Sequence, residues 1–332
     1  MQAIWMITSS FLFATMGVCV KFASQYFTSA ELVFYRGALG IVFMAAYARA
    51  GGTSLKTSYP AMHAWRSVIG VVSLSAWFYA IANLPLATAM TLNYMSSVWI
   101  AAFLVGGALM LWRPATTQAA GNGRSAGPPQ ARPAPSGGSA PHEVGSEGAL
   151  SNQGPLVLAI LASFAGVVML LRPAMDQNQV FAGLIGLLSG LGAAFAYMQV
   201  MTLARMGEPE ARTVFYFAVG TAVAGALGMA ITGLSPWRWQ HAIWLLPLGL
   251  LASLGQICMT KAYSMSSNHG GTLMVANLQY SGIVFSAFYG MALFGDDIPA
   301  LGWAGMALIV LSAIAATFLR SRAAPNSPAE EH

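Results

Sequence analysis

The chain is 332 residues long, and 57% of its residues are hydrophobic while only 8% are charged. Average soluble domains contain roughly 25% charged residues. The 15 basic and 10 acidic residues cluster between long uncharged stretches. This composition excludes a water-soluble globular protein and indicates a chain that lies largely in contact with lipid.

The uncharged stretches are long enough to cross a bilayer as helices. A helix rises about 1.5 Å per residue and the hydrocarbon layer is about 30 Å thick, so about 20 apolar residues make one crossing. The stretch 67–112 must therefore hold two crossings, and Pro85 marks the turn between them because proline lacks a backbone donor. Continuous apolar runs also favour helices over the alternating strands of a barrel. We expect an all-α membrane protein with ten transmembrane helices, at about residues 3–22, 32–48, 65–82, 87–111, 155–171, 181–204, 214–232, 241–262, 272–294 and 300–319.

The distribution of basic residues predicts the orientation. With the N-terminus in the cytoplasm, eleven Lys and Arg residues, Arg66 among them, lie inside or at the inner boundary, and four lie toward the outside. Cytoplasmic loops carry such an excess, so both termini are expected in the cytoplasm. The basic residues that set this orientation also explain the net charge of +5. The positive charge therefore does not indicate nucleic-acid binding, and no nucleic-acid partner is expected. The first span lacks a basic leader and a cleavage site, and we expect it to be retained.

Two halves of the chain resemble each other in short segments. The tripeptide Val-Phe-Tyr occurs at 33–35 and 214–216, in the second and seventh expected helices. Leu-Asn-Tyr at 92–94 matches Leu-Gln-Tyr at 278–280, in the fourth and ninth. Because each half holds five helices, the second half enters the membrane from the opposite side, which predicts an inverted repeat. A site between two such halves opens to each side of the membrane in turn, as in alternating-access transporters.

The repeats define the expected domain organisation. Residues 1–173 form the first repeat, residues 174–321 the second, and residues 322–332 a polar cytoplasmic tail. Inside the first repeat, residues 113–153 are rich in Gly, Pro, Ala and Ser and cannot bury enough apolar surface to fold. We expect them to form a disordered cytoplasmic loop, either as a linker or as a docking segment.

Three segments carry a resemblance to a known family: Glu-Leu-Val-Phe-Tyr-Arg at 31–36, Gly-Val-Val-Met-Leu-Leu-Arg-Pro at 166–173, and Leu-Gln-Tyr at 278–280 with Phe-Gly-Asp at 294–296. In these segments the chain resembles the EamA-type transporters of the drug/metabolite transporter superfamily. The long loop and the end of the fourth helix depart from the family pattern. The resemblance implies ten helices in two inverted repeats, a bacterial inner (plasma) membrane location, and export, or less often uptake, of small organic solutes such as amino acids. A membrane enzyme or a non-transporting sensor is the alternative from another class.

Four charged residues near or within the spans need an account, because an ionised group in the membrane is costly unless it is paired or hydrated. Lys21, Glu31 and Arg36 are expected near the outer boundary. They form either an interfacial cluster that anchors the helices or a gate and anion-attracting vestibule. Lys261 is expected near the inner end of the eighth helix, where it either snorkels to the cytoplasm or meets a carboxylate of the substrate.

Aromatic and amide side chains deep in the spans indicate where a solute binds. Most tryptophans lie near span ends, as interfacial belts require, but Trp77 and Trp99 lie deeper. An aromatic-lined cavity with a few amides, between the two halves, is typical of a small-molecule site. Packing between helices is the alternative for each residue. The candidate substrate-binding residues are Trp77, Tyr79, Tyr94, Trp99, Gln256, Asn277, Gln279 and Tyr280.

The sequence shows no metal-binding or catalytic constellation. Its histidines occur singly near span ends, and Cys19 and Cys258 lie in different spans as packing residues. We therefore expect no cofactor, no metal and no enzymatic activity. The expected partners are a small organic solute, the lipid bilayer and, optionally, a second copy of the chain in a homodimer. Because no Asp or Glu lies in the middle of a span, we expect transport driven by the solute gradient, with proton coupling through Lys261, a tyrosine or a chain of waters as the alternative.

Overall fold

The computed structural model describes residues 2–100, 102–103, 154–171, 177–265, 275 and 277–323. Every regular element among them is a helix. The expected loop at 113–153 and most of the expected tail at 322–332 lie outside the described residues. The elements in chain order are α1 (Gln2–Ala23), α2 (Ser29–Ala50), α3 (Pro60–Asn83), α4 (Leu86–Tyr94), α7 (Gly154–Leu171), α8 (Gln177–Arg205), α9 (Glu210–Thr232), α10 (Trp239–Ala242), α11 (Leu245–Ser264), α13 (Ser281–Tyr289), the π-helix η1 (Gly290–Phe294) and α14 (Ala300–Ala323).

Six helical segments of the described residues are long and apolar enough to cross a membrane. They are α1, α2, α3, α8, α9 and Trp239–Ser264, which contains α10 and α11. Their outer faces carry large apolar side chains such as Val42, Val72 and Ile231, which are 69%, 68% and 86% exposed. Soluble proteins rarely expose so much apolar helix surface, whereas lipid covers it in a membrane. The protein is therefore an all-helical integral membrane protein.

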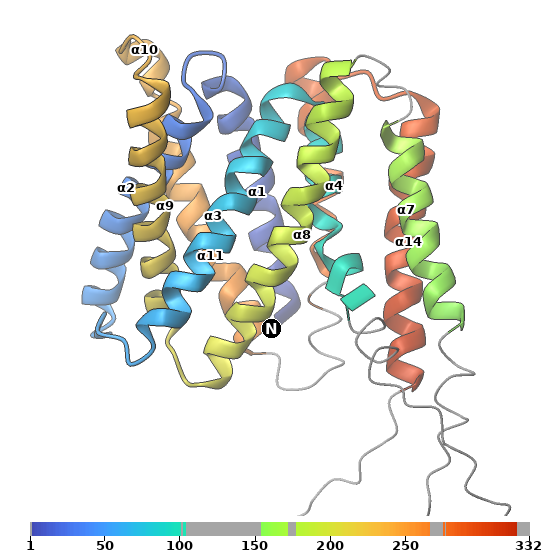
Figure 1. The fold of residues 1–332 in the computed structure, drawn as a ribbon, viewed down its shortest axis with the longest axis horizontal. Helices are drawn as coiled ribbons and strands as arrows, with labels where there is room; N and C mark the ends of the chain where they lie inside the picture. Colours follow the sequence, from blue (N-terminus) through green and yellow to red (C-terminus); the bar gives the residue numbers. More distant parts are fainter. Residues whose placement is uncertain are drawn as a thin grey trace, which may run out of the picture.

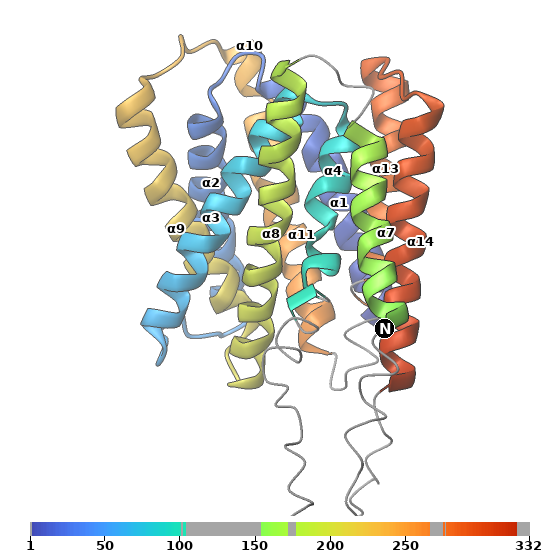
Figure 2. The same ribbon diagram turned by 45° about the vertical axis from the view of Figure 1, so that its right-hand side comes forward.

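The helices pack in pairs that are far apart in the sequence. α2 lies along α9 at one side of the molecule and α7 lies along α14 at the other, as Figures 1 and 2 both show. Between these pairs, α1 packs against α11 and α3 packs against α8. Most of the buried apolar core comes from α1, α3, α4 and α11. The centre of the molecule is thus enclosed by helices from both halves of the chain.

Glycine allows α2 and α9 to approach each other closely. A Cβ atom at Gly37 in α2 would lie 2.8 Å from Ala222 Cα in α9. A Cβ atom at Gly225 in α9 would likewise lie 2.8 Å from Phe34 Cβ in α2. Neither position has room for a side chain, because the atoms it would meet belong to the facing backbone or lie directly on it. At these two points the glycines let the backbones of α2 and α9 approach each other directly.

The fourth expected span is interrupted after Tyr94. α4 ends at Tyr94, a turn follows at Met95, and the chain is helical again at 96–100. The N–H of Met95 is shared among carbonyls of the preceding turn, including that of Thr91. The sequence indicated one continuous helix here, because no Gly or Pro marks the break.

The eighth and ninth expected spans also contain turns. A turn at 243–244 separates α10 from α11, so Pro247 lies in the first turn of α11. N–H groups in a first turn have no acceptor within the helix, and the N–H that proline lacks therefore costs α11 no hydrogen bond. In the ninth, a turn at Gln279 and Tyr280 precedes α13. α13 continues into η1, which ends at Gly295 in the left-handed conformation with φ 62°.

The connections lie at two ends of the bundle, which we call the lower and upper ends as drawn in Figure 1. The N-terminus, the end of α14 and the connections 51–59 and 206–209 lie at the lower end. The connections that follow α1 and α9 lie at the upper end. The two ends of the described chain are therefore on the same side of the molecule.

Candidate solute-binding site

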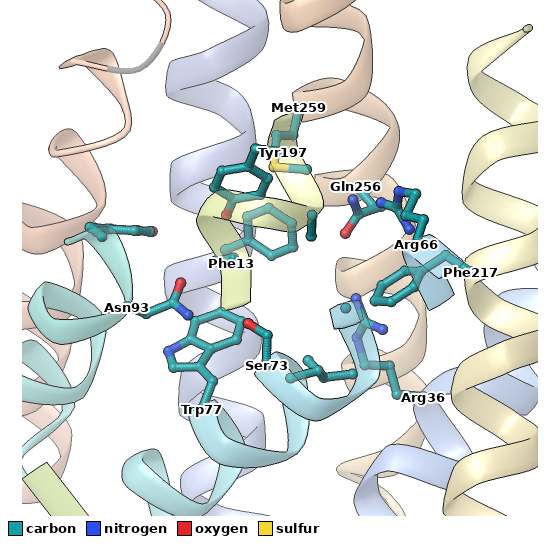
Figure 3. Close-up of a pocket in the computed structure, with 15 residues that line it drawn as sticks. Phe13, Arg36, Arg66, Ser73, Trp77, Asn93, Tyr197, Phe217, Gln256 and Met259 are labelled. Carbon is teal, nitrogen blue, oxygen red and sulfur yellow. The ribbon is translucent and has the colours of Figure 1, made fainter. Parts of the chain in front are cut away.

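A buried cavity lies where α1, α2, α3, α4, α8, α9 and α11 converge (Figure 3). Its volume is about 60 Å³, which is room for several water molecules. Apolar groups such as Phe13, Leu74 and Met259 form much of its wall, and polar side chains project from the remainder.

Two arginines form one end of the cavity. Arg36 from α2 and Arg66 from α3 are buried, with 6% and 2% of their surface exposed. Their guanidinium carbons lie 5.2 and 4.4 Å from the centroid of the Phe217 ring, from α9. In Figure 3 this ring lies between the two charged groups. Nε of both arginines and Nη1 of Arg66 are buried and have no hydrogen-bond partner among the described residues.

The opposite end of the cavity is formed by an amide and an indole. Asn93 Nδ2 donates a hydrogen bond of 3.1 Å to Ser189 Oγ, which orients the amide from α4. Trp77 from α3 is 6% exposed, and its Nε1 has no partner among the described residues. Its ring packs edge to face against the ring of Phe13, with the two ring centroids 6.2 Å apart. Figure 3 shows Asn93 and Trp77 together, at the side of the cavity away from the arginines.

Of the residues proposed from the sequence, Arg36, Trp77, Tyr94 and Gln256 line the cavity. Gln256 also lines a smaller adjoining cavity of about 10 Å³ next to Arg36, which links it to the arginine end. Gln279 stands behind the wall: its Nε2 donates a 3.3 Å hydrogen bond to the hydroxyl of Tyr197, which itself faces the cavity.

Four further candidates are not among the residues that line this cavity. Trp99 packs edge to face on Phe164 of α7, with ring centroids 5.0 Å apart. Tyr79 packs on Phe181 of α8 at 6.1 Å. Tyr280 is 4% exposed and belongs to the apolar core, and Asn277 lies in the helical turn before α13. The structure therefore separates the aromatic set into a cavity group and a packing group.

At the upper end, Lys21 joins three segments. Its Nζ lies 2.9 Å from Oδ1 of Asp296, which follows η1. Oδ2 of Asp296 accepts a 2.9 Å hydrogen bond from the backbone N–H of Leu86, at the start of α4. The two side chains are only 16% and 12% exposed. This contact ties α1, α4 and the end of the ninth span together at one mouth of the bundle.

Glu31 is occupied by a separate set of contacts at the upper end. It forms a capping box with Thr28 at the start of α2. Its Oε2 also accepts a 2.6 Å hydrogen bond from Ser235 Oγ, and its Oε1 one of 2.9 Å from Ser235 N, in the connection after α9. Glu31 therefore does not form an ion pair with Arg36, although the two lie on the same helix.

The lower end has its own polar contacts. Lys261 Nζ lies 4.4 Å from the centroid of the Trp5 ring. Glu208, in the connection before α9, pairs with Arg212 Nη1 at 3.0 Å and accepts a 2.9 Å hydrogen bond from Thr57, and its Oε2 lies 3.5 Å from His63 Nε2. Burial favours the neutral acid, but the hydrogen bonds from Thr57 and Arg212 and the positive charge of Arg212 outweigh it, so the pKa of Glu208 lies below its ordinary value.

Sequence reasoning missed several cavity residues, of which Arg66 is the most informative. It was assigned to the cytoplasmic boundary because it borders an uncharged run, as topogenic arginines do. The signal that could have corrected this is Pro60, a residue favoured in the first turn of a helix, which places Arg66 almost two turns inside α3. Asn93 was read only as part of the internal repeat, and Tyr197 and Phe217 carried no distinguishing pattern.

Within the part of the chain that the structure describes, no three His, Cys, Asp or Glu side chains come together in a way that could hold a metal ion. Cys19 and Cys258 are buried free thiols. The polar groups that do converge are the arginines, amides and hydroxyls of the cavity.

Comparison with known proteins places this cavity in context. The chain is 30% identical over 310 residues to the pseudopaline exporter CntI of Pseudomonas aeruginosa strain UCBPP-PA14, and the match covers 93% of each chain. The chain belongs to a family of small-metabolite membrane transporters. The transporter is also 24% identical over 315 residues to a riboflavin transporter of Rhizobium johnstonii, covering 94% of this chain and 89% of that one.

A protein of solved structure shares the fold of the transporter. A protein of known crystal structure superposes on the transporter with a TM-score of 0.60 and 19% identity, over 97% of this chain and 98% of that chain. No protein-family model matches the transporter.

Proposed function

We propose that the protein is an EamA-type exporter that moves a small organic metabolite through ten helices in two inverted five-helix repeats. The single observation that carries the proposal is the buried polar cavity, which is enclosed by α1 to α4 from the first half and by α8, α9 and α11 from the second. Export is favoured over uptake because the relative at 30% identity is an exporter, whereas the riboflavin transporters are more distant. The solute binds in this cavity, between the repeats.

The packing pattern supports an inverted repeat. If α1, α2, α3, α4 and α7 correspond to α8, α9, α11, α13 and α14, then α2–α9 and α7–α14 pair each helix with its own counterpart. Under the same correspondence, the α3–α8 contact maps onto the α11–α1 contact, and the α4–α8 contact maps onto the α13–α1 contact. The structure contains both members of each pair. The interruptions after Tyr94 and at Tyr280 fall at equivalent positions. Such an arrangement allows the two halves to exchange conformations.

The charge distribution supports a cytoplasmic lower end in a bacterial inner membrane. Lys56, Arg205 and Arg212 lie in or beside the connections at that end, and the upper end carries Glu31 and Asp296. An excess of Lys and Arg is expected on the cytoplasmic side. A reporter fused after residue 332 or inserted near residue 138 should therefore report the cytoplasm, and one inserted near residue 177 the outside. An external signal from residue 138 would reverse the orientation.

Alternating access through the cavity can be tested with single cysteines, because Cys19 and Cys258 are the only native ones and are both buried. In a Cys19→Ala, Cys258→Ala background, Ser73→Cys places a thiol on the cavity wall. We expect a membrane-impermeant maleimide to label this thiol from either side of the membrane, because the cavity opens to each side in turn. Val72→Cys is the matched control: it is the preceding residue but faces lipid, and we expect no labelling there.

Labelling of the Ser73→Cys variant from one side only, under all conditions, would contradict alternating access through this cavity. Transport itself is tested by untargeted mass spectrometry of the medium of cells that express the protein. We expect at least one small organic compound to accumulate outside these cells relative to cells that carry an empty vector. Accumulation inside the cells would instead indicate uptake.

A further inference from the structure

Two buried positive charges without counter-charges are the least expected feature of the molecule. Ionised side chains inside a membrane protein are normally paired, because the charge otherwise loses its hydration without compensation. Arg36 and Arg66 lie at the centre of a helical bundle, are almost fully buried, and share one aromatic ring. Cation–π contact with Phe217 compensates only part of the lost hydration and does nothing for the repulsion between the two cations.

The acidic residues of the described chain are engaged elsewhere or exposed. Glu31 binds Ser235, Glu208 binds Arg212, Glu210 binds Ser264, Asp296 binds Lys21, and Asp297 is exposed beside Asp296. In the part of the chain that the structure describes, no ion pair joins an acidic residue to Arg36 or Arg66. The counter-charge for the two arginines must therefore come from outside these residues.

The unpaired groups point to an anion with a planar pair of oxygens. Nε and Nη1 of Arg66 both lack acceptors, so donors on two sides of its planar guanidinium group are unpaired. A guanidinium binds a carboxylate through two parallel hydrogen bonds, one from Nη2 and the other from either Nη1 or Nε. The Nε of Arg36, on the other side of Phe217, is also unpaired. Arginine is favoured over lysine at such sites because its donors are held in a fixed plane.

The other end of the cavity indicates the remainder of the ligand. Trp77, Phe13 and Met259 offer an apolar and aromatic surface, and the Asn93 amide and the Trp77 N–H offer single hydrogen bonds. A molecule that spans the cavity would therefore place its charge at the arginines and an uncharged, partly apolar portion at the indole.

We propose that Arg36 and Arg66 form an anion-binding subsite, and that the exported solute is an amphiphilic organic acid whose carboxylate binds there. This inference rests on the proposed function, because it takes the cavity as the solute site. Binding of the acid supplies the missing counter-charge, so the closed arrangement of helices around the arginines is more stable with the solute than without it.

Thermal unfolding of the purified full-length protein in detergent tests the subsite with a matched pair of probes. Benzoate and benzamide have nearly the same shape, but only benzoate carries a carboxylate. At constant ionic strength and chloride concentration, we expect saturating benzoate to raise the unfolding midpoint by roughly 2–4 °C and benzamide to leave it unchanged. Equal shifts from the two compounds, or none from benzoate, would overturn the proposal.

Variants assign the effect to the arginines. Arg66→Gln should abolish the benzoate shift, and Arg66→Lys should retain a smaller one because it keeps the charge but loses the planar guanidinium donors. Arg49→Gln is the matched control: Arg49 is an exposed arginine on the same helix as Arg36, and the shift should persist. A full benzoate shift in Arg66→Gln would show binding outside the subsite and refute the assignment.

A built-in carboxylate gives a second test that does not depend on any probe. Gln256 lines the cavities beside both arginines, and Gln256→Glu would place an acid there. We expect this variant to have a higher unfolding midpoint than the wild type and no further rise with benzoate. A lower midpoint together with an intact benzoate shift would mean that the arginines need no anion at this position.

The mass-spectrometry experiment separates failure of this inference from failure of the proposed function. If compounds accumulate in the medium and are carboxylates at neutral pH, both stand. If the accumulated compounds are uncharged, export is retained but the anion subsite is wrong as a solute site. If nothing accumulates but benzoate still stabilises the protein through Arg66, export fails while the anion subsite remains.

Discussion

At the scale of single residues, the ring of Phe217 has two roles, because it contacts both guanidinium groups and separates them. Phe217→Leu removes two cation–π contacts and also removes the ring that separates the two positive charges, so the charges repel each other more strongly. We expect it to reduce stability by about 1–3 kcal/mol, seen as a lower unfolding midpoint in detergent. Phe215→Leu, two residues earlier on α9 and without an arginine contact, should reduce it by less; equal losses would assign the effect of Phe217 to packing alone.

Glu208 makes stability at the lower end dependent on pH. Its pKa in the folded protein is below the ordinary value of 4.5, so its ionised form contributes stability above that value, and the contribution is lost as the pH falls through the folded pKa. We expect Glu208→Gln to lower the unfolding midpoint at pH 7. The difference from the wild type should narrow steadily below about pH 4.5, and a difference that stayed constant down to about pH 3 would rule out this explanation.

At the scale of elements, the pairing of α2 with α9 depends on glycine. Gly37→Ala and Gly225→Ala each insert a methyl group against the facing backbone, so the two helices must separate or rotate. We expect each to destabilise the protein by about 1–3 kcal/mol, the usual cost of overpacking, measured by thermal unfolding in detergent. Gly51→Ala, at the end of α2, meets its nearest atom at 3.4 Å and serves as the control. Unchanged midpoints in both test variants would show that the contact is loose.

At the scale of the whole molecule, Asp296 joins Lys21 of α1 to the start of α4 at the upper end of the bundle, and we expect this contact to hold that mouth closed. Asp296→Asn removes the ion pair and weakens the link to the start of α4, which shifts the population toward states open at that mouth. Combined with Ser73→Cys, we expect Asp296→Asn to speed maleimide labelling of the introduced thiol from the outside and to leave labelling from the cytoplasm no faster. Faster labelling from the cytoplasm alone would contradict the prediction, because it would mean that the Lys21–Asp296 contact restricts access from the cytoplasmic side.

Energy coupling is also a property of the whole molecule. In the described spans the polar cavity holds arginines, amides and hydroxyls, and none of its lining residues is an acid. Proton-driven transporters generally use a carboxylate of raised pKa at the binding site. We therefore expect export to follow the gradient of the solute. An imposed pH gradient that drove solute uphill in proteoliposomes, and still did so in Glu31→Gln, would disprove this expectation.

The amino-acid sequence by itself determined the membrane location, the positions of most helices and the expectation of transport. It could do so because the thickness of the bilayer sets the length of an apolar run, and because an interrupting proline or charge is visible in the sequence. The turn at Pro85 is a local feature of the same kind. The relatives confirm the transporter, and the described helices agree with the positions of most spans.

Only the tertiary structure decided which side chains face the centre. Pro60 indicates how far Arg66 lies inside α3 but not the direction in which its side chain points, and Trp99 appeared as deep as Trp77. The rotation of each helix about its axis separates these cases: α3 turns Arg66 and Trp77 toward the cavity, whereas Trp99 packs on α7. That rotation is set by contacts such as Gly70 against Phe217 and Gly192 against Ser73, which join residues far apart in the sequence. No local pattern encodes such contacts, because each depends on the shape of a helix from the other half of the chain.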